Sequence, residues 1–184
     1  MEHSQDVKSV AWHPTLNILA SCSYDDSIKL YLDDPSDDWF PFATLTAHGS
    51  TVWDVAWSPC GKFFASVSDD RSIRIWRAKG DDLKQWETIQ VVENAHDRPI
   101  YSAAWGKGID SNPNSRGWLA TTGGDGKLNI WSVIVREAAS LDFLNLIPQT
   151  GGGRCGEGDF SSTARGHTRS LRHQRRSLVP APQP

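Results

Sequence analysis

The sequence has 184 residues, a hydrophobic fraction of 38% and a formal net charge of −3 at pH 7. Residues 1–150 carry 13 Lys and Arg against 20 Asp and Glu, whereas residues 151–184 carry six Arg against two acidic residues. Binding to a nucleic acid backbone requires a dense basic surface, so the acidic first part disfavours that function. Three cysteines are too few and too scattered for a disulfide framework or a tetrahedral metal cage.

The first ten residues, MEHSQDVKSV, lack the basic and apolar regions of a secretory signal. No apolar run approaches the roughly 18 residues that a membrane-spanning helix needs. The small number of cysteines suits a reducing compartment. We therefore expect a cytoplasmic chain without membrane contact, with the nucleus as an additional location.

One pattern occurs three times and starts at His3, His48 and His96, which are 45 and 48 residues apart. A period of this size indicates a repeat architecture in which each unit forms one supersecondary structure. The repeat region, residues 1–135, divides into units at about 3–46, 48–92 and 96–135.

Within each unit, short apolar or alternating runs are separated by turn residues, which predicts strands. The first two units have such runs at 7–12, 18–23, 27–31, 42–46, 52–57, 63–67, 72–77 and 85–92. In the third unit an exposed insertion, GKGIDSNPNSRG, precedes strands at 118–122 and 127–132. Short strands at regular spacing predict an all-β chain.

The pattern stops after the third unit. Residues 136–149 include EAASLDFLNLI, which is compatible with a short helix. Residues 150–184 are rich in Gly, Ser, Arg and Pro, with almost no β-branched or aromatic residues. Such a segment buries too little apolar area to offset its loss of conformational entropy, so we expect a disordered basic tail.

Each unit has the same polar residues at matching positions: a His, a Ser or Thr, an Asp in a turn, and an aromatic residue six positions after that Asp. Buried polar groups must be paired. We expect the carboxylate to accept from the imidazole, the imidazole from the hydroxyl, and the hydroxyl from the indole N–H. Tyr31 replaces Trp in the first unit, so its network should be weaker. The residues are His3, Ser21 and Asp25; His48, Ser66, Asp70 and Trp76; and His96, Thr121, Asp125 and Trp131.

A set of His, Ser and Asp could also be a hydrolytic triad. Three copies at a fixed spacing favour a structural repeat over one active site, and no G-x-S-x-G elbow is present. The His residues do not form a metal-binding pattern, and no Gly-rich loop follows a strand and opens a helix. We therefore expect neither enzymatic activity nor a cofactor.

These features resemble the WD40 repeat, whose units assemble as blades of a β-propeller. The stretches HSQDVKSVAWHP, ASCSYDDSIKLY, DDW, HGSTVWDVAWSPCG and SDDRSIRIWR further resemble the family of WD40 subunits of the cytosolic iron–sulfur protein assembly machinery. The Tyr-Asp-Asp turn followed by Lys-Leu-Tyr carries most of this resemblance, since Tyr stands where the repeat usually has Trp.

The resemblance implies a seven-bladed propeller in the targeting complex that delivers iron–sulfur clusters to cytosolic and nuclear apoproteins. The implied partners are a small scaffold subunit and a HEAT-repeat adaptor. Seven units need roughly 300 residues, so three units should form an open arc, as in a truncated form with an unrelated tail. The alternative is a generic WD40 adaptor in another complex, such as a ubiquitin ligase receptor or chromatin reader. A further alternative is nucleic-acid binding through the Arg-rich tail.

WD40 proteins generally bind partners through the narrow rim of the propeller, and the resemblance places three positions of each unit there. Trp53 and Tyr101 are large aromatic residues of the kind enriched at interface hot spots. The rim positions are Asp6, Lys8 and Tyr24; Thr51, Trp53 and Asp69; and Pro99, Tyr101 and Gly124.

Overall fold

The computed structural model of the chain describes residues 2–33, 38–80, 83–108, 113–136 and 143–149. All of the regular structure in these ranges is β-strand, arranged as three sheets of four strands. The prediction of an all-β chain is therefore confirmed. The expected disordered tail, 150–184, lies outside the described residues.

Each sheet is an antiparallel meander whose strands follow chain order. The first sheet contains β1 (Val7–Trp12), β2 (Ile18–Ser23), β3 (Ser27–Asp33) and β4 (Trp39–Thr46). The second contains β5 (Val52–Trp57), β6 (Phe63–Ser68), β7 (Ile73–Lys79) and β8 (Gln85–Val92). The third contains β9 (Ile100–Gly106), β10 (Ser115–Gly123), β11 (Leu128–Arg136) and β12 (Phe143–Gln149).

The expectation of a short helix within 136–149 is wrong for residue 136 and for residues 143–149. Residues 143–149 form β12, which pairs antiparallel with β11 from Ile130↔Gln149 to Arg136↔Phe143. The sequence of β12, FLNLIPQ, includes Pro and several weak helix formers, so hydrogen bonding to the otherwise unpaired edge of β11 decides its conformation. The third sheet thus continues to residue 149 and does not end at 135, while residues 137–142 lie outside the described part of the chain.

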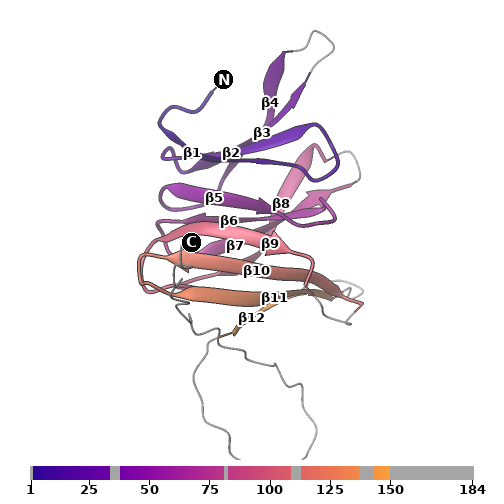
Figure 1. The fold of residues 1–184 in the computed structure, drawn as a ribbon. Helices are drawn as coiled ribbons and strands as arrows, with labels where there is room; N and C mark the ends of the chain where they lie inside the picture. The colour runs from indigo at the N-terminus through magenta and orange to yellow at the C-terminus, as the bar shows by residue number, and fades with distance from the viewer. Residues whose placement is uncertain (1, 34–37, 81–82, 109–112, 137–142, 150–184) are drawn as a thin grey trace, which may run out of the picture.

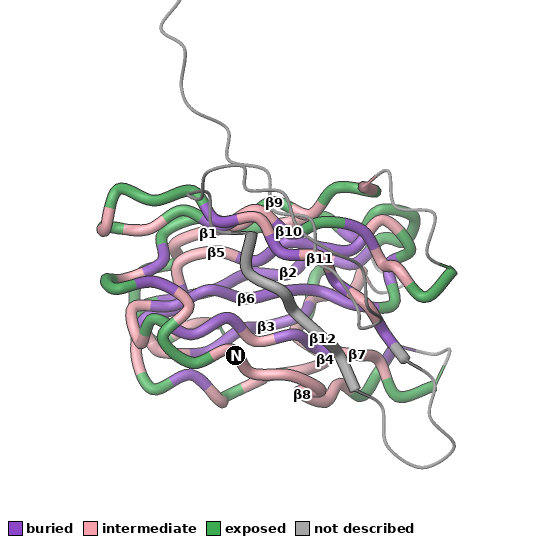
Figure 2. The backbone as a smooth tube through the Cα atoms, turned by 90° about the horizontal axis from the view of Figure 1, so that it is seen from below, coloured by how far each residue is buried: buried purple, intermediate pink, exposed green. Residues whose placement is uncertain are grey.

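The three sheets stack face to face, with the second between the first and the third (Figure 1). The first strands of the sheets, β1, β5 and β9, are neighbours along this stack. One apolar cluster fills the space between the first and second sheets, and another fills the space between the second and third. Burial is therefore concentrated in the middle of the stack, around β6 and its neighbours (Figure 2).

The turn between the second and third strands has the same backbone in every sheet. Its residues Asp26, Arg71 and Gly126 all have positive φ, between 63° and 71°. Each follows a turn aspartate, Asp25, Asp70 or Asp125. A residue in the left-handed region lets the chain reverse within this short connection, so the carboxylates are held at the same end of the strands in all three sheets.

Candidate interaction site

In the second sheet, the four repeated polar side chains form one continuous chain of hydrogen bonds. His48 Nδ1 lies 2.9 Å from Asp70 Oδ2, and His48 Nε2 lies 2.7 Å from Ser66 Oγ. The indole N–H of Trp76 donates to Ser66 Oγ over 2.9 Å. This pattern assigns the imidazole proton to Nδ1, because the carboxylate can only accept.

The third sheet repeats this arrangement. His96 Nδ1 lies 3.0 Å from Asp125 Oδ1, His96 Nε2 lies 2.9 Å from Thr121 Oγ1, and Trp131 Nε1 donates to Thr121 over 2.9 Å.

The first sheet has only part of this hydrogen-bond network. His3 contacts Ser21 at 2.6 Å and Asp25 at 3.0 Å. Tyr31 makes no hydrogen bond to Ser21 among the described residues, so one link of the network is missing there.

The turn carboxylates also accept hydrogen bonds that the sequence reasoning missed. Ser27 and Ser72 each donate a hydroxyl to the aspartate two positions before them. The repeated sequence Ser-x-Asp-x-Ser in the first two units was the available signal. In the third unit Lys127 takes this position, and its backbone amide donates to Asp125.

These contacts shift the ionisation of the aspartates. Burial alone would raise the pKa of Asp125, but hydrogen bonds from His96 and from the Lys127 and Asp97 amides lower that pKa to about 2. The pKa of Asp25 and that of Asp70 are also well below their ordinary value, because hydrogen bonds from His and Ser outweigh the effect of burial. All three carboxylates are therefore ionised at neutral pH.

The network is suited to structural support. Ser66 and Thr121 are fully buried, and each hydroxyl contacts both an imidazole and an indole. A hydroxyl enclosed in this way has no room for a substrate. Its role is to pair the polar groups that the sheets bury.

The rim residues predicted from the sequence include a contiguous group, which we call the rim stripe: Lys8, Tyr24, Trp53, Asp69 and Tyr101. Lys8 Nζ lies 5.2 Å from the centre of the Tyr24 ring and 5.4 Å from that of Trp53. Trp53 and Tyr101 meet edge to face, with ring centroids 5.4 Å apart. The stripe thus runs across all three sheets, at the end of the strands where the turn aspartates lie.

The other predicted rim residues lie around the stripe, with one exception. Asp6 is exposed and pairs with Lys8 over 3.3 Å. A side chain at Gly124 would touch the Tyr101 ring, and the carbonyl of half-buried Pro99 accepts from the Gly124 amide. Thr51 is buried, and its carbonyl accepts from the Asp69 amide, so the expectation that it is a surface contact is wrong.

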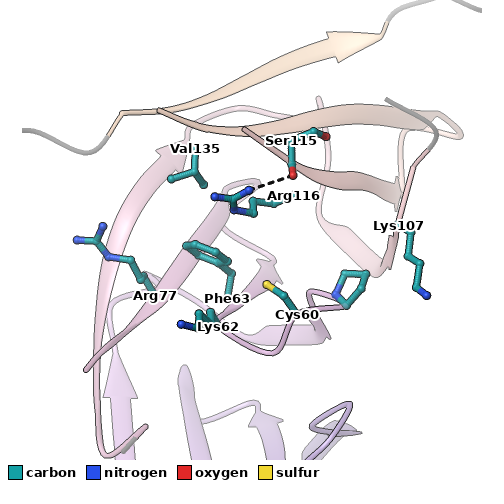
Figure 3. A pocket seen from close by; sticks show the side chains of 9 residues that line it. Cys60, Lys62, Phe63, Arg77, Lys107, Ser115, Arg116 and Val135 are labelled. Atoms are coloured by element: carbon teal, nitrogen blue, oxygen red, sulfur yellow. Dashed lines mark hydrogen bonds between the residues drawn. The ribbon is translucent and has the colours of Figure 1, made fainter. Parts of the chain in front are cut away.

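A pocket of about 800 Å³ lies at the opposite ends of the strands, between the second and third sheets. Figure 3 shows Phe63 and Val135 inside it and Cys60 at its edge. The lining includes cations, but Arg77 is already held by Glu87, 2.6 Å from Nη2 to Oε1. No Asp or Glu lines this pocket within the described ranges.

Asp54 is a structural residue that sequence reasoning missed. Its carboxylate accepts from Ser9 Oγ of the first sheet at 2.7 Å, and from Ser102 Oγ and the Ala103 amide of the third at 3.0 and 2.9 Å. It also accepts from its neighbour Val55. One carboxylate in β5 thus joins all three sheets and fixes the spacing of the inner strands beneath the rim stripe.

His13 links two sheets in a similar way. Its Nε2 lies 3.1 Å from the Gly61 carbonyl, while Nδ1 accepts from the amides of Thr15 and Leu16. Burial lowers its pKa, although the bond to Gly61 opposes that shift.

The described residues contain no group of three or more His, Cys, Asp or Glu side chains placed to hold a metal ion. They also contain no helix with the length and hydrophobicity needed to cross a bilayer.

Meandering four-stranded sheets that stack face to face, with a His, Ser or Thr, Asp and Trp network, define a β-propeller repeat protein. The family model for "WD domain, G-beta repeat" matches residues 1–31, 39–77 and 86–132. The chain therefore belongs to the WD40 repeat family.

Particular relatives within that family share a name. The chain is 39% identical over 130 residues to a "Probable cytosolic iron-sulfur protein assembly protein CIAO1 homolog" of Ixodes scapularis, covering 70% of this chain and 38% of the relative. It is similar to a "Probable cytosolic iron-sulfur protein assembly protein 1" of Vanderwaltozyma polyspora, with 35% identity, 75% of this chain and 54% of the relative covered. A protein of that name from Chaetomium globosum is 28% identical, with 77% and 36% covered. The chain thus spans between about a third and about half of these relatives.

Proposed function

We propose that this chain is a non-catalytic WD40 scaffold of cytosolic iron–sulfur protein assembly. It binds other proteins of that machinery through the rim stripe and so helps deliver iron–sulfur clusters to apoproteins. The names of its relatives support the process. The observation that carries the binding mode is the continuity of the stripe over all three sheets.

The geometry of the stripe suits recognition of protein surfaces. Tyr24 and Tyr101 are about half exposed, and Trp53 between them is held by the Tyr101 ring, by the Lys8 ammonium and by Asp69, 3.4 Å from its indole nitrogen. Aromatic side chains held in this way lose little conformational freedom on binding, which is why Trp and Tyr dominate interface hot spots. Lys8 adds a charge that can pair with a partner carboxylate.

The partners proposed for this surface are a small scaffold subunit, a HEAT-repeat adaptor and iron–sulfur apoproteins. These assemblies would form in the cytoplasm, and nuclear apoproteins would extend the location to the nucleus. The chain contributes contacts and no chemistry, which is consistent with the use of its His, Ser and Asp residues inside the sheets.

Substitution of Trp53 by Ala tests this proposal. The variant should lose at least tenfold in affinity for the iron–sulfur assembly subunits, because truncation of a central aromatic anchor typically costs about 2 kcal/mol of binding free energy. The measurement is quantitative capture of those subunits from cytosol by the tagged full chain. Phe40→Ala is the control, since Phe40 is also a large aromatic residue accessible to a partner, 42% exposed, but lies in β4, outside the stripe.

Both variants should keep the β-sheet circular dichroism of the parent chain. Unchanged capture by Trp53→Ala, or an equal loss with Phe40→Ala, would refute the role of the stripe. Recovery of ubiquitin ligase or chromatin subunits in place of iron–sulfur assembly proteins would refute the proposed process.

A further inference from the structure

The pocket between the second and third sheets has an apolar centre surrounded by positive charge. Its volume of about 800 Å³ is within the usual range for ligand-binding sites. Phe63 of β6 and Val135 of β11 form the apolar part and belong to the cluster that joins the two sheets. The pocket therefore lies inside the stack, away from its two outer faces. The charged side chains of the lining, within the described ranges, are all cationic: Lys62, Arg77, Lys107 and Arg116.

The local backbone restrains the side chain of Arg116. Its Nη1 group donates to the carbonyls of Pro113 and Ser115, over 3.3 and 3.2 Å. The carbonyl of Arg116 accepts from the indole N–H of Trp105 over 2.8 Å. Gly117 follows with a φ of 103°, and a Cβ at this position would collide with the backbone of β9, so only glycine fits. The guanidinium is thus oriented before any ligand binds.

One edge of the Arg116 guanidinium has no acceptor in the described part of the chain. In Arg77 the corresponding Nε and Nη2 groups both donate to Glu87 Oε1, over 3.2 and 2.6 Å. The Nε and Nη2 groups of Arg116 have no such partner among the described residues. Lys107 is exposed and forms no ion pair within the same ranges. Because a guanidinium edge matches a carboxylate with two parallel hydrogen bonds, the pocket is suited to an anionic ligand.

We propose that this pocket binds an acidic peptide segment of another protein, with an apolar side chain between its acidic residues. One carboxylate of the segment accepts from the Nε and Nη2 groups of Arg116, and another pairs with Lys107. The apolar side chain packs on Phe63 and Val135. The pocket lies at the opposite ends of the strands from the rim stripe, so both surfaces can be occupied at the same time. This second site does not depend on the function proposed for the stripe.

The arrangement of the lining favours a peptide over a free phosphate ion. Figure 3 shows Arg77 and Lys107 on opposite sides of the pocket, with Arg116 between them. Cations spread in this way match the successive carboxylates of an extended chain, whereas one phosphate ion would pair with only some of them. The apolar centre also requires an apolar group in the ligand, and inorganic phosphate has none.

Fluorescence anisotropy of the labelled peptide Glu-Glu-Leu-Glu-Glu with the full chain tests the proposal. Arg116→Gln should weaken binding about tenfold, because it removes a charge-assisted pair with two hydrogen bonds. Lys107→Gln should weaken binding about threefold, since an exposed ion pair contributes less. Arg98→Gln is the matched control: it removes the same charge from an exposed position just before β9, at the other end of that strand from Lys107.

The Arg-rich end of the sequence could attract the same peptide by charge alone, since residues 151–184 contain six Arg. Two cysteines distinguish these cases. Cys60 is exposed at the edge of the pocket, whereas Cys155 follows Arg154 in the Arg-rich stretch. The bound peptide should slow alkylation of Cys60 by iodoacetamide and leave that of Cys155 unchanged, as measured by mass spectrometry of proteolytic fragments. Slower alkylation of Cys155 alone would overturn the proposal.

Other results would also contradict a peptide site. These are no binding of the acidic peptide, equal binding of Gln-Gln-Leu-Gln-Gln, or an equal effect of Arg98→Gln and Lys107→Gln. Equal binding of Glu-Glu-Ser-Glu-Glu would show that the apolar centre takes no part. Displacement of the peptide by a similar concentration of inorganic phosphate would indicate a phosphate site instead. Because Lys107 is exposed, Lys107→Gln should keep the parent's circular dichroism and decides the outcome if Arg116→Gln disturbs the loop.

Discussion

Asp54 is a single carboxylate on which the alignment of three sheets depends. It receives two hydroxyls and an amide from the first and third sheets, so its charge is compensated by groups up to 49 positions away in sequence. It also acts on a neighbouring thiol: burial, and secondly the Asp54 charge, raise the pKa of Cys22 to about 12. Cys22 is therefore an inert core residue at neutral pH.

Asp54→Ala should lower the free energy of unfolding by about 3 kcal/mol, because it leaves several donors without an acceptor. Urea denaturation followed by tryptophan fluorescence measures the change. Asp97→Ala is the control: Asp97 is exposed and pairs with Lys127 on the surface, so its loss should cost less than about 1 kcal/mol. Equal effects of the two substitutions would show that Asp54 does not join the sheets.

At the scale of the sheet, the aromatic end of the network differs between units. Trp76 and Trp131 donate to a buried hydroxyl, whereas Tyr31 makes no such bond within the described residues. The expectation that the hydrogen-bond network of the first sheet is weaker rests on this one difference, Tyr31 in place of Trp. The sheet geometry is otherwise retained, since Tyr31 still pairs with Leu19 as Trp76 pairs with Phe64.

Trp76→Phe should destabilise the chain by about 1–2 kcal/mol, through the lost hydrogen bond and some lost packing. Tyr31→Phe is the matched variant. It should lower the free energy of unfolding by less than half as much, because removal of the Tyr31 hydroxyl leaves no donor or acceptor of the network unpaired. The midpoints and slopes of urea denaturation give both values. Similar losses from the two variants would argue against the indole bond as a stabilising contact.

For the whole molecule, the three turn carboxylates act together on stability. A carboxyl whose pKa is lower in the folded chain contributes stability above its ordinary pKa, and that contribution is lost as the pH falls through the folded value. For Asp125 the pH range over which this stability is lost extends from 3.8 down to about 2. For Asp25 and Asp70 the range extends to lower pH. The folded chain is thereby stabilised at neutral pH relative to acid pH.

Unfolding free energy should fall modestly between pH 7 and pH 5, because the pKa of His13 is lowered in the folded chain, and should fall steeply below about pH 4, where the turn carboxyls take up protons. Asp70→Asn should be less stable than the parent at pH 6 and should show a shallower fall below pH 4, since it lacks one of the three groups. Urea titrations from pH 6 to pH 2.5 measure both slopes. An unchanged slope in Asp70→Asn would mean that this carboxyl has no special role in acid unfolding.

The strands were largely predictable because each sheet is built from short local hairpins. Alternation and turn residues placed ten of the strands near their observed positions, whereas β9 received no predicted range and β12 was missed. The helix-forming residues that misled the prediction lie before β12 in the sequence, and the pairing of β12 with the edge of β11 is a contact that the sequence pattern does not show. Thr51 was misplaced for a related reason: the rim pattern does not show which residues the backbone turns inward.

The sequence by itself determined the number of units and the His, Ser or Thr, Asp and Trp networks. Those residues lie within one unit at a fixed spacing, so a repeated pattern is sufficient to connect them. Only the tertiary structure showed the Asp54 bridge and the continuity of Lys8, Trp53 and Tyr101. These features depend on contacts between different sheets, and the distance between side chains of separate units is set by how the sheets stack.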